Sequence, residues 1–247
     1  MDVMRNIKKY INKQGTSKPI FSKDVYDYVN SHETIPYDVV MEYISRYIDQ
    51  NDNINRYQKG IFYKSVDTPF GKTGINEFEL ISRLCIVNKK GERIGYETGP
   101  GLINQLGLST QMSTKMYIVT NNYRTTLLRN TKDLTLIKPP LKINNENYKY
   151  FMFLDVISNK YDANIDVDDK EYKIILCNLL KKYHIDIEKL LCYTKYYTST
   201  KRKLIYATLT ELMIYKHNIR NDEYRKGMLE ATKDPEFIKR NEDKSGH

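Results

Sequence analysis

Asp155, Glu171 and Lys173 are the residues whose types and spacing come nearest to a catalytic set. A carboxylate followed by a Glu and a Lys two positions apart on a strand can hold a divalent cation and a water for phosphodiester hydrolysis, as in restriction-type nucleases. The sequence around Glu171 has a helical pattern, however, and positions i and i+2 of a helix do not share a face. We therefore keep a metal-dependent nuclease only as the third interpretation, and we expect neither a metal site nor a cofactor.

Motifs of the common enzyme classes are absent from the sequence: it holds no GxxxxGK[ST], GxSxG or HExxH motif and no paired CxxC. We predict that the protein is not an enzyme. The three cysteines, Cys85, Cys177 and Cys192, lie far apart in apolar segments, which predicts buried, reduced thiols. The sequence also has no apolar run of about 18 residues. These features predict a cytoplasmic protein with no membrane partner.

The net charge of the chain is +9, and the excess is greatest in the middle third. Residues 67–150 hold twelve Lys and Arg against seven Asp and Glu. Such a surplus fits a polyanionic partner, and it fits equally a surface that only keeps the protein soluble.

The first 66 residues predict three helices and a hairpin. Apolar spacing places helices over residues 1–13, 22–31 and 37–50, and two short alternating runs in residues 54–64 flank the turn Gln58-Lys59-Gly60. This order is that of a winged helix-turn-helix, in which the third helix can enter a DNA major groove and the hairpin touches the adjacent backbone. We predict a winged-helix DNA-binding domain over residues 1–66.

The candidate DNA contacts lie on the first helix, the third helix and the hairpin. They are Lys8, Lys9, Tyr37, Ser45, Arg46, Arg56, Tyr57 and Lys59. The third helix also carries Asp38, Glu42 and Asp49, which would repel phosphate if they faced the groove. A protein-interaction module without DNA binding is therefore the alternative.

The rest of the chain predicts a mixed α/β domain over residues 67–158 and a helical region over residues 159–247, which could belong to the same domain. Residues 64–74 are predicted to be a linker, and residues 148–156 fit either a strand or a helix. Three short strands are predicted at residues 115–120, 125–129 and 134–138, within a mixed sheet. The remaining predicted helices cover residues 78–87, 171–183, 187–193 and 199–216. The expected fold class is α+β.

Residues 97–119 hold the most distinctive phrase of the sequence, ETGPGLINQLGLSTQMSTKMYIV. Glycines at 99, 101 and 107 frame apolar residues at helical spacing, which predicts a short packed helix with glycine at both ends. This phrase resembles the AbiEi-like antitoxins of type IV toxin–antitoxin and abortive-infection systems. The matching residues are Gly101, Asn104, Leu106, Gly107, Leu108, Ser109, Thr110 and Gln111.

The resemblance covers about residues 1–157 and includes the predicted hairpin. It implies an antitoxin whose winged helix binds promoter DNA with inverted repeats and represses its own operon. A second domain would counteract a cognate nucleotidyltransferase-like toxin. By the same resemblance, Arg46, Arg56, Tyr57 and Lys59 would contact DNA, and residues 101–111 would be a structural hallmark of the second domain.

Overall fold

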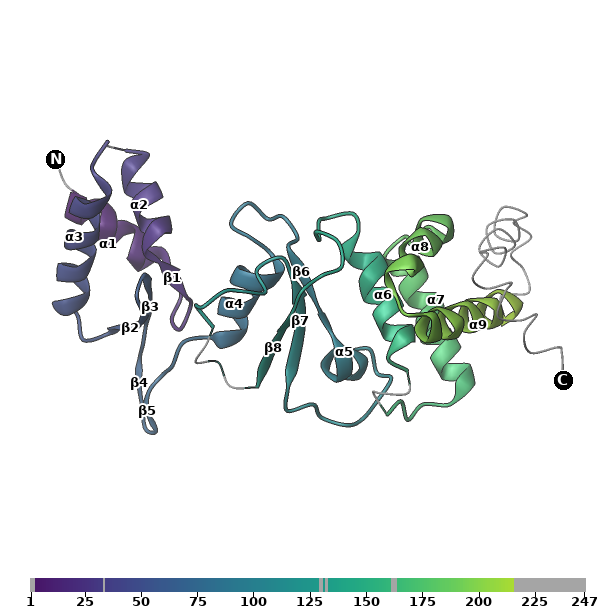
Figure 1. Cartoon of the computed structure of the whole chain (residues 1–247). Coiled ribbons are helices and arrows are strands. Elements are labelled where there is room, and N and C mark those ends of the chain that lie inside the picture. Colours follow the sequence, from purple (N-terminus) through teal and green to yellow (C-terminus); the bar gives the residue numbers. More distant parts are fainter. Residues whose placement is uncertain (1–2, 33, 129–130, 132, 161–163, 216–247) are drawn as a thin grey trace, which may run out of the picture. The chain divides into compact units, whose positions relative to one another are not determined.

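The computed structural model describes residues 3–32, 34–128, 131, 133–160 and 164–215 (Figure 1). The chain has an α+β fold, as predicted. Within the described residues it forms two compact units. Unit 1 comprises the residues up to Leu84 together with Thr125–Thr131, and unit 2 comprises the remainder. The division between the units thus lies after Leu84, whereas the sequence places a boundary after residue 66.

Unit 1 begins with three helices, α1 (Val3–Lys13), α2 (Ser22–Asn30) and α3 (Tyr37–Asp49). They confirm the helices predicted in this part of the chain. Each helix turns an apolar stripe inward, because residues three and four apart lie on one face. The buried core of these helices is formed by Val3, Ile7, Ile11, Val25, Val29, Val40, Ile44, Tyr47 and Ile48.

A three-stranded antiparallel sheet completes this core. Its order is β1-β3-β2, with β1 at Ile20–Phe21, β2 at Ile54–Gln58 and β3 at Ile61–Lys64. The predicted hairpin is confirmed as β2 and β3. Gly60 forms its turn with a φ of 80°, a conformation that costs glycine little. Strand β1 is not evident in the sequence, because two residues cannot show alternation.

Residues 64–74 are not a linker, and this prediction is wrong. Strands β4 (Asp67–Thr68) and β5 (Gly71–Lys72) pair in a small hairpin. Helix α4 (Glu77–Ile81) follows and continues into a π-helical turn, η1 (Ser82–Ile86), where the sequence predicts one helix. The Asn76 side chain caps α4 by accepting a 3.1 Å hydrogen bond from the Glu79 backbone N–H.

Unit 2 contains the predicted mixed sheet. Strand β6 (Gly95–Thr98) runs antiparallel to β7 (Met116–Thr120), and β7 runs parallel to β8 (Leu134–Ile137). The predicted strand at residues 125–129 is wrong over its described part, because residues 125–128 contain no strand: 126–128 form a bend and a turn, and the segment belongs to unit 1. The sheet therefore has β8, and not this segment, beside β7.

Helix α5 (Gly99–Gln105) lies between β6 and β7 in the chain and confirms the predicted glycine-framed helix. Gly99 and Gly107 both have a φ of 72°. The Gly107 N–H donates to the Asn104 carbonyl at 2.9 Å and the Leu108 N–H to the Ile103 carbonyl at 3.0 Å, a pattern that ends a helix at a left-handed glycine.

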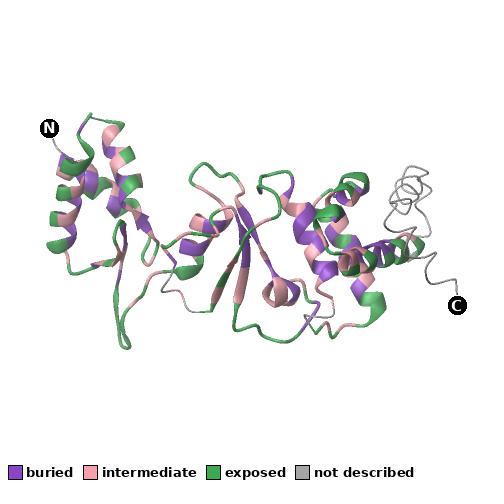
Figure 2. Cartoon of the chain, in the orientation of Figure 1, coloured by how far each residue is buried: buried purple, intermediate pink, exposed green. Residues whose placement is uncertain are grey.

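Four further helices pack with the sheet in one core. They are α6 (Tyr148–Ser158), α7 (Asp169–Lys182), α8 (Ile187–Tyr193) and α9 (Ser199–Tyr215), with a 3₁₀ turn η2 (Thr194–Tyr196) before α9. Residues 148–156, which fitted either a strand or a helix, belong to helix α6. Most residues of this helix are buried (Figure 2). Because this core joins residues of β6, β7, α5 and α6 to those of α7, α8 and α9, the helical region folds onto the sheet.

Two of the three cysteines are buried as predicted, Cys85 and Cys177, but the prediction is wrong for Cys192, which is exposed. Cys192 lies on the outer side of the short helix α8, whose buried residues are Ile187 and Leu190. All three are free thiols. No helix among the described residues combines the length and apolar character needed to cross a membrane.

Candidate nucleic-acid interface

Helix α3 presents a charged side to solvent. Pro36 precedes its first residue, Tyr37, and the fixed φ of proline suits the start of a helix. The stripe Val40, Ile44, Tyr47 and Ile48 is buried, so the opposite side of the helix is accessible. The exposed charged residues there are Asp38, Glu42, Arg46 and Asp49.

Arg46 forms an ion pair on this exposed side. Its Nη2 lies 2.5 Å from Oε1 of Glu42, one helical turn earlier, and its guanidinium lies 5.8 Å from the centre of the Tyr43 ring. The two paired side chains are 60% and 62% exposed. An exposed pair at this spacing stabilises a helix by only about 0.3–0.5 kcal/mol. The pair therefore orients Arg46 without adding much to stability.

The hairpin is joined to α3 by Arg56 and Ser45. The Arg56 guanidinium donates a 3.2 Å hydrogen bond to the Ser45 hydroxyl, which links β2 to the middle of α3. Arg56 itself is exposed. Lys59 is exposed at the hairpin turn beside Gly60. The structure thus brings together Ser45 and Arg56, and it leaves Arg46 exposed on α3 and Lys59 accessible beside the turn.

Tyr57 differs from the other candidate contacts. The register of β2 against β3 shifts between Arg56 and Gln58, so Tyr57 lies in a β-bulge. Its hydroxyl is buried and has no hydrogen-bond partner among the described residues. We therefore expect Tyr57 to shape the hairpin and not to offer its hydroxyl to DNA.

The remaining candidates lie at the margins of α3. The Lys8 ammonium of α1 lies 5.9 Å from the ring centre of Tyr47 on α3, and Lys8 and Lys9 are both exposed. Tyr37 packs edge-on against the Tyr26 ring, with 5.0 Å between ring centres, and keeps 47% of its surface exposed. Arg56 of β2 therefore adjoins the exposed side of α3 through Ser45, whereas Lys8 of α1 contacts Tyr47 of the buried stripe.

The family-like motif of unit 2 makes a network of hydrogen bonds with the loop before α7. The Asn104 amide donates to the carbonyls of Ser109 and Gln111, at 3.0 and 3.3 Å. The Ser109 hydroxyl donates to the Asn164 carbonyl at 3.1 Å, and the Asn164 amide donates to Gln111 Oε1 at 3.2 Å.

Thr110 completes this network. Its N–H and its hydroxyl both donate to Oδ2 of Asp166, at 2.8 and 2.5 Å, and these bonds lower the pKa of the Asp166 carboxyl. Leu108 is fully buried, Leu106 packs against the same core, and a side chain at Gly101 would meet Oε1 of Glu97 at 2.6 Å. The motif residues thus join the loop after α5 to the loop before α7.

A shallow hollow of about 240 Å³ lies beside this network. Its lining residues come from the start of α5, the loop before β7, β7 itself and the loop before α7. They are Pro100, Gln111, Met112, Ser113, Thr114, Lys115, Tyr117 and Asn164. The Ser113 hydroxyl donates to the Lys115 carbonyl, so part of this polar lining is already satisfied within the loop.

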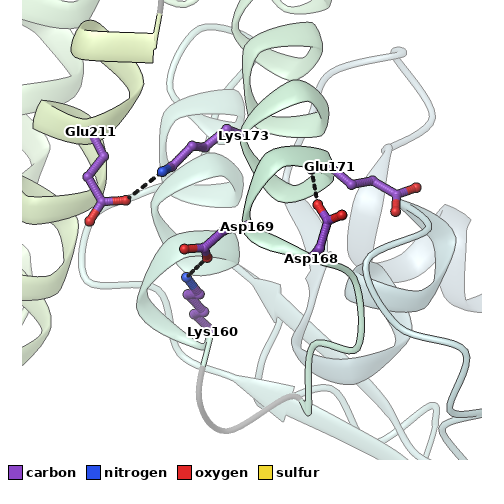
Figure 3. Close-up of polar contacts among 6 residues, drawn as sticks. All are labelled: Lys160, Asp168, Asp169, Glu171, Lys173 and Glu211. Carbon is purple, nitrogen blue, oxygen red and sulfur yellow. Dashed lines mark hydrogen bonds and ion pairs between the residues drawn. The ribbon is translucent and has the colours of Figure 1, made fainter.

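The nuclease-like set is not assembled. Lys173 pairs with Glu211 of α9 at 3.2 Å, while Glu171 lies in the first turn of α7, where its N–H donates to the capping Asp168. Figure 3 shows the side chains of Glu171 and Lys173 leaving α7 in different directions. Among the described residues, no three His, Cys, Asp or Glu side chains form a group that could hold a metal ion.

Asp155, the third member of that set, belongs to a different cluster that sequence reasoning missed. Its carboxylate accepts hydrogen bonds from Tyr197 at 2.6 Å, Thr98 at 2.8 Å and Tyr96 at 3.0 Å. The available signal was the lone carboxylate in the apolar run 148–157, because a buried charge needs donors. Its partners could not be identified from the sequence.

Comparison with known proteins adds no family to these observations. Neither a scan against protein-family models nor a search of curated proteins found a match to this chain.

Proposed function

We propose that the protein is a DNA-binding antitoxin of the type IV class. Unit 1 would act as a winged helix-turn-helix on promoter DNA with inverted repeats, and unit 2 would counteract a nucleotidyltransferase-like toxin. The proposal places the protein in the cytoplasm, without a cofactor and without an enzymatic activity of its own.

The observation that best supports the DNA-binding part of this proposal is the Arg56–Ser45 hydrogen bond. It joins an antiparallel hairpin to the third of three packed helices, as a wing and a recognition helix would require. The cations of the hairpin and of α1 support the same reading, because phosphate contacts give most of the salt-dependent affinity for DNA. The antitoxin half is supported by the likeness of residues 101–111 to the AbiEi-like motif.

A protein-interaction module is the second candidate, and the acidic side of α3 favours it. Asp38, Glu42 and Asp49 are exposed there, and such a surface would suit a basic protein partner. This candidate predicts that the protein neutralises a toxin but binds no DNA.

DNA binding is tested with the full-length chain and a duplex from the region upstream of its own gene. We expect sequence-preferring binding that weakens steeply with salt, and Arg56→Ala and Lys59→Ala should each weaken it and lower the salt slope by about one. Lys90→Ala removes an exposed lysine from unit 2 and is the matched control. Binding that is indifferent to sequence, or unchanged in both variants, would exclude the repressor role.

The antitoxin role is tested separately by co-expression with a neighbouring nucleotidyltransferase-like gene. Wild-type protein should restore growth, and Arg56→Ala should restore it equally while failing to repress a promoter reporter. Growth arrest that persists with the wild-type protein would exclude the antitoxin role without affecting the DNA-binding result.

A further inference from the structure

The charges of α1, α3 and the β2–β3 hairpin are divided between these three elements by sign. Helix α3 carries three acids and one base, whereas α1 and the hairpin carry only bases. The bases of α1 are Arg5, Lys8, Lys9 and Lys13, and the exposed bases of residues 54–64 are Arg56 and Lys59, while Lys64 is half-buried and donates to the Asn12 carbonyl. Arg56 contacts Ser45 beside the acidic side of α3, and Lys8 contacts Tyr47 on its buried side, so cations of the hairpin and of α1 adjoin this helix. In a complex with DNA, the cations of α1 and the hairpin would then bind phosphates, and the acidic side of α3 would face groups other than phosphates.

A carboxylate on a helix that faces the major groove is repelled by the DNA phosphates. It can be accommodated there only where it accepts a hydrogen bond from a base. In the major groove the donors are base amino groups, and the characteristic partner of a Glu carboxylate is the N4 amino group of cytosine. Among the acids of α3, Glu42 is the one paired with a base of the same helix: it lies one turn before Arg46 and accepts a hydrogen bond from that guanidinium.

Arg46 can keep this bond and still bind a base. A guanidinium has five N–H donors in a planar fork, and its bond to Glu42 uses Nη2, which leaves other donors for O6 and N7 of a guanine. The Tyr43 ring beneath the guanidinium further limits its orientation.

We propose that Glu42 is a specificity-determining residue that accepts a hydrogen bond from a cytosine N4 amino group and orients Arg46 toward a guanine. This inference rests on the proposed DNA binding. It assigns the acidic side of α3 to base recognition, and it makes the flanking cations responsible for affinity.

The test is selection of bound sequences from a random duplex DNA library by full-length wild-type protein, Glu42→Gln, Arg46→Ala and Asp67→Asn. Asp67→Asn removes the same charge from the exposed strand β4 and is the matched control. Equal thermal unfolding of the four proteins would establish that the exposed substitutions leave the fold intact.

We expect the wild-type motif to contain a cytosine position at which Glu42→Gln loses a preference of about tenfold or more, with the other positions unchanged. Arg46→Ala should lose a nearby guanine in the same way, and Asp67→Asn should select the wild-type motif. A Glu42→Gln motif identical to that of the wild type would overturn the role of Glu42 while leaving the DNA-binding function in place. If wild-type protein enriches no motif at all, the proposed function itself fails.

Discussion

The Tyr197 hydroxyl donates a 2.6 Å hydrogen bond to Oδ1 of Asp155, while Tyr96 and Thr98 donate to Oδ2. Asp155 lies on the apolar helix α6, and its donors come from β6 and from the turn before α9. Because a buried carboxylate is costly unless its oxygens are hydrogen-bonded, these three hydroxyls determine how the three segments pack.

Removing the Tyr197 hydroxyl should destabilise the protein. Tyr197→Phe leaves Oδ1 of Asp155 without that donor, and we expect the free energy of unfolding to fall by about 1.5–3 kcal/mol. Equilibrium urea unfolding measures the change. Tyr196→Phe is the matched control, because Tyr196 is exposed and keeps its ring contact with Phe151. Equal stability of the two variants would contradict the assigned bond.

Asp155 should also give the protein a distinct pH dependence. Burial raises the pKa of Asp155 above its ordinary value of 3.8, although hydrogen bonds from Tyr197, Thr98 and Tyr96 and the charge of Lys201 oppose this shift. The folded state therefore holds this proton to a higher pH than the unfolded chain does. The stability due to Asp155 is present below pH 3.8 and is lost as the pH rises through the raised folded pKa.

Asp155→Asn cannot titrate and isolates this effect. The unfolding free energy of the variant relative to wild type should increase as the pH rises from about 4, and level off once Asp155 is ionised in both states. Urea unfolding of both proteins across a pH series measures the difference. A difference that stays constant with pH would show that Asp155 titrates normally in the folded protein.

Gly95 should not tolerate a side chain. A Cβ there would lie 2.2 Å from the Cys85 carbonyl oxygen and 2.5 Å from that of Val119. Both contacts are with backbone, so Gly95→Ala should lower the unfolding free energy by about 1–3 kcal/mol or more. Gly74→Ala is the control, since a Cβ at Gly74 meets nothing within 4 Å. Chemical unfolding should rank Gly95→Ala well below Gly74→Ala, and the reverse order would refute the close approach.

The cysteines should differ in reactivity. Cys192 is exposed, whereas burial of Cys85 raises its thiol pKa to about 11, and Cys177 is also buried. Because the thiolate is the reactive form, brief alkylation of the native protein at about pH 8 should label Cys192 first. Peptide mass spectrometry identifies the site. Cys192→Ser should lose the fast reaction, and fast labelling of Cys85 in the native protein would contradict its burial.

The sequence predicted the elements whose signals are local. Apolar spacing locates α1, α3 and α7, and Gly60 marks the turn of the hairpin, because each pattern is complete within a few residues. The two-residue strand β1 and the β4–β5 hairpin were missed, since their pairing depends on partners and not on a pattern. In the same way, the partners of Asp155 lie 42 to 59 positions away in the chain.

In the candidate interface, too, some features have a local signal in the sequence and others depend on distant partners. Exposure of Glu42, Arg46 and Lys59 follows from helix and turn patterns. The Arg56–Ser45 bond and the inward hydroxyl of Tyr57 do not, because they depend on how β2 meets α3 and on a bulge in the register.

The chain passes between its two units three times, after Leu84, after Arg124 and after Thr131. The short returning piece belongs to unit 1, where the Gln58 amide donates a 2.7 Å hydrogen bond to the Leu127 carbonyl and Leu128 is buried. A gene fragment that ends at codon 84 would therefore leave unit 1 without this piece. Recombination that exchanges one N-terminal segment for another would have to preserve the fit to Leu127 and Leu128, so the two units should be inherited together.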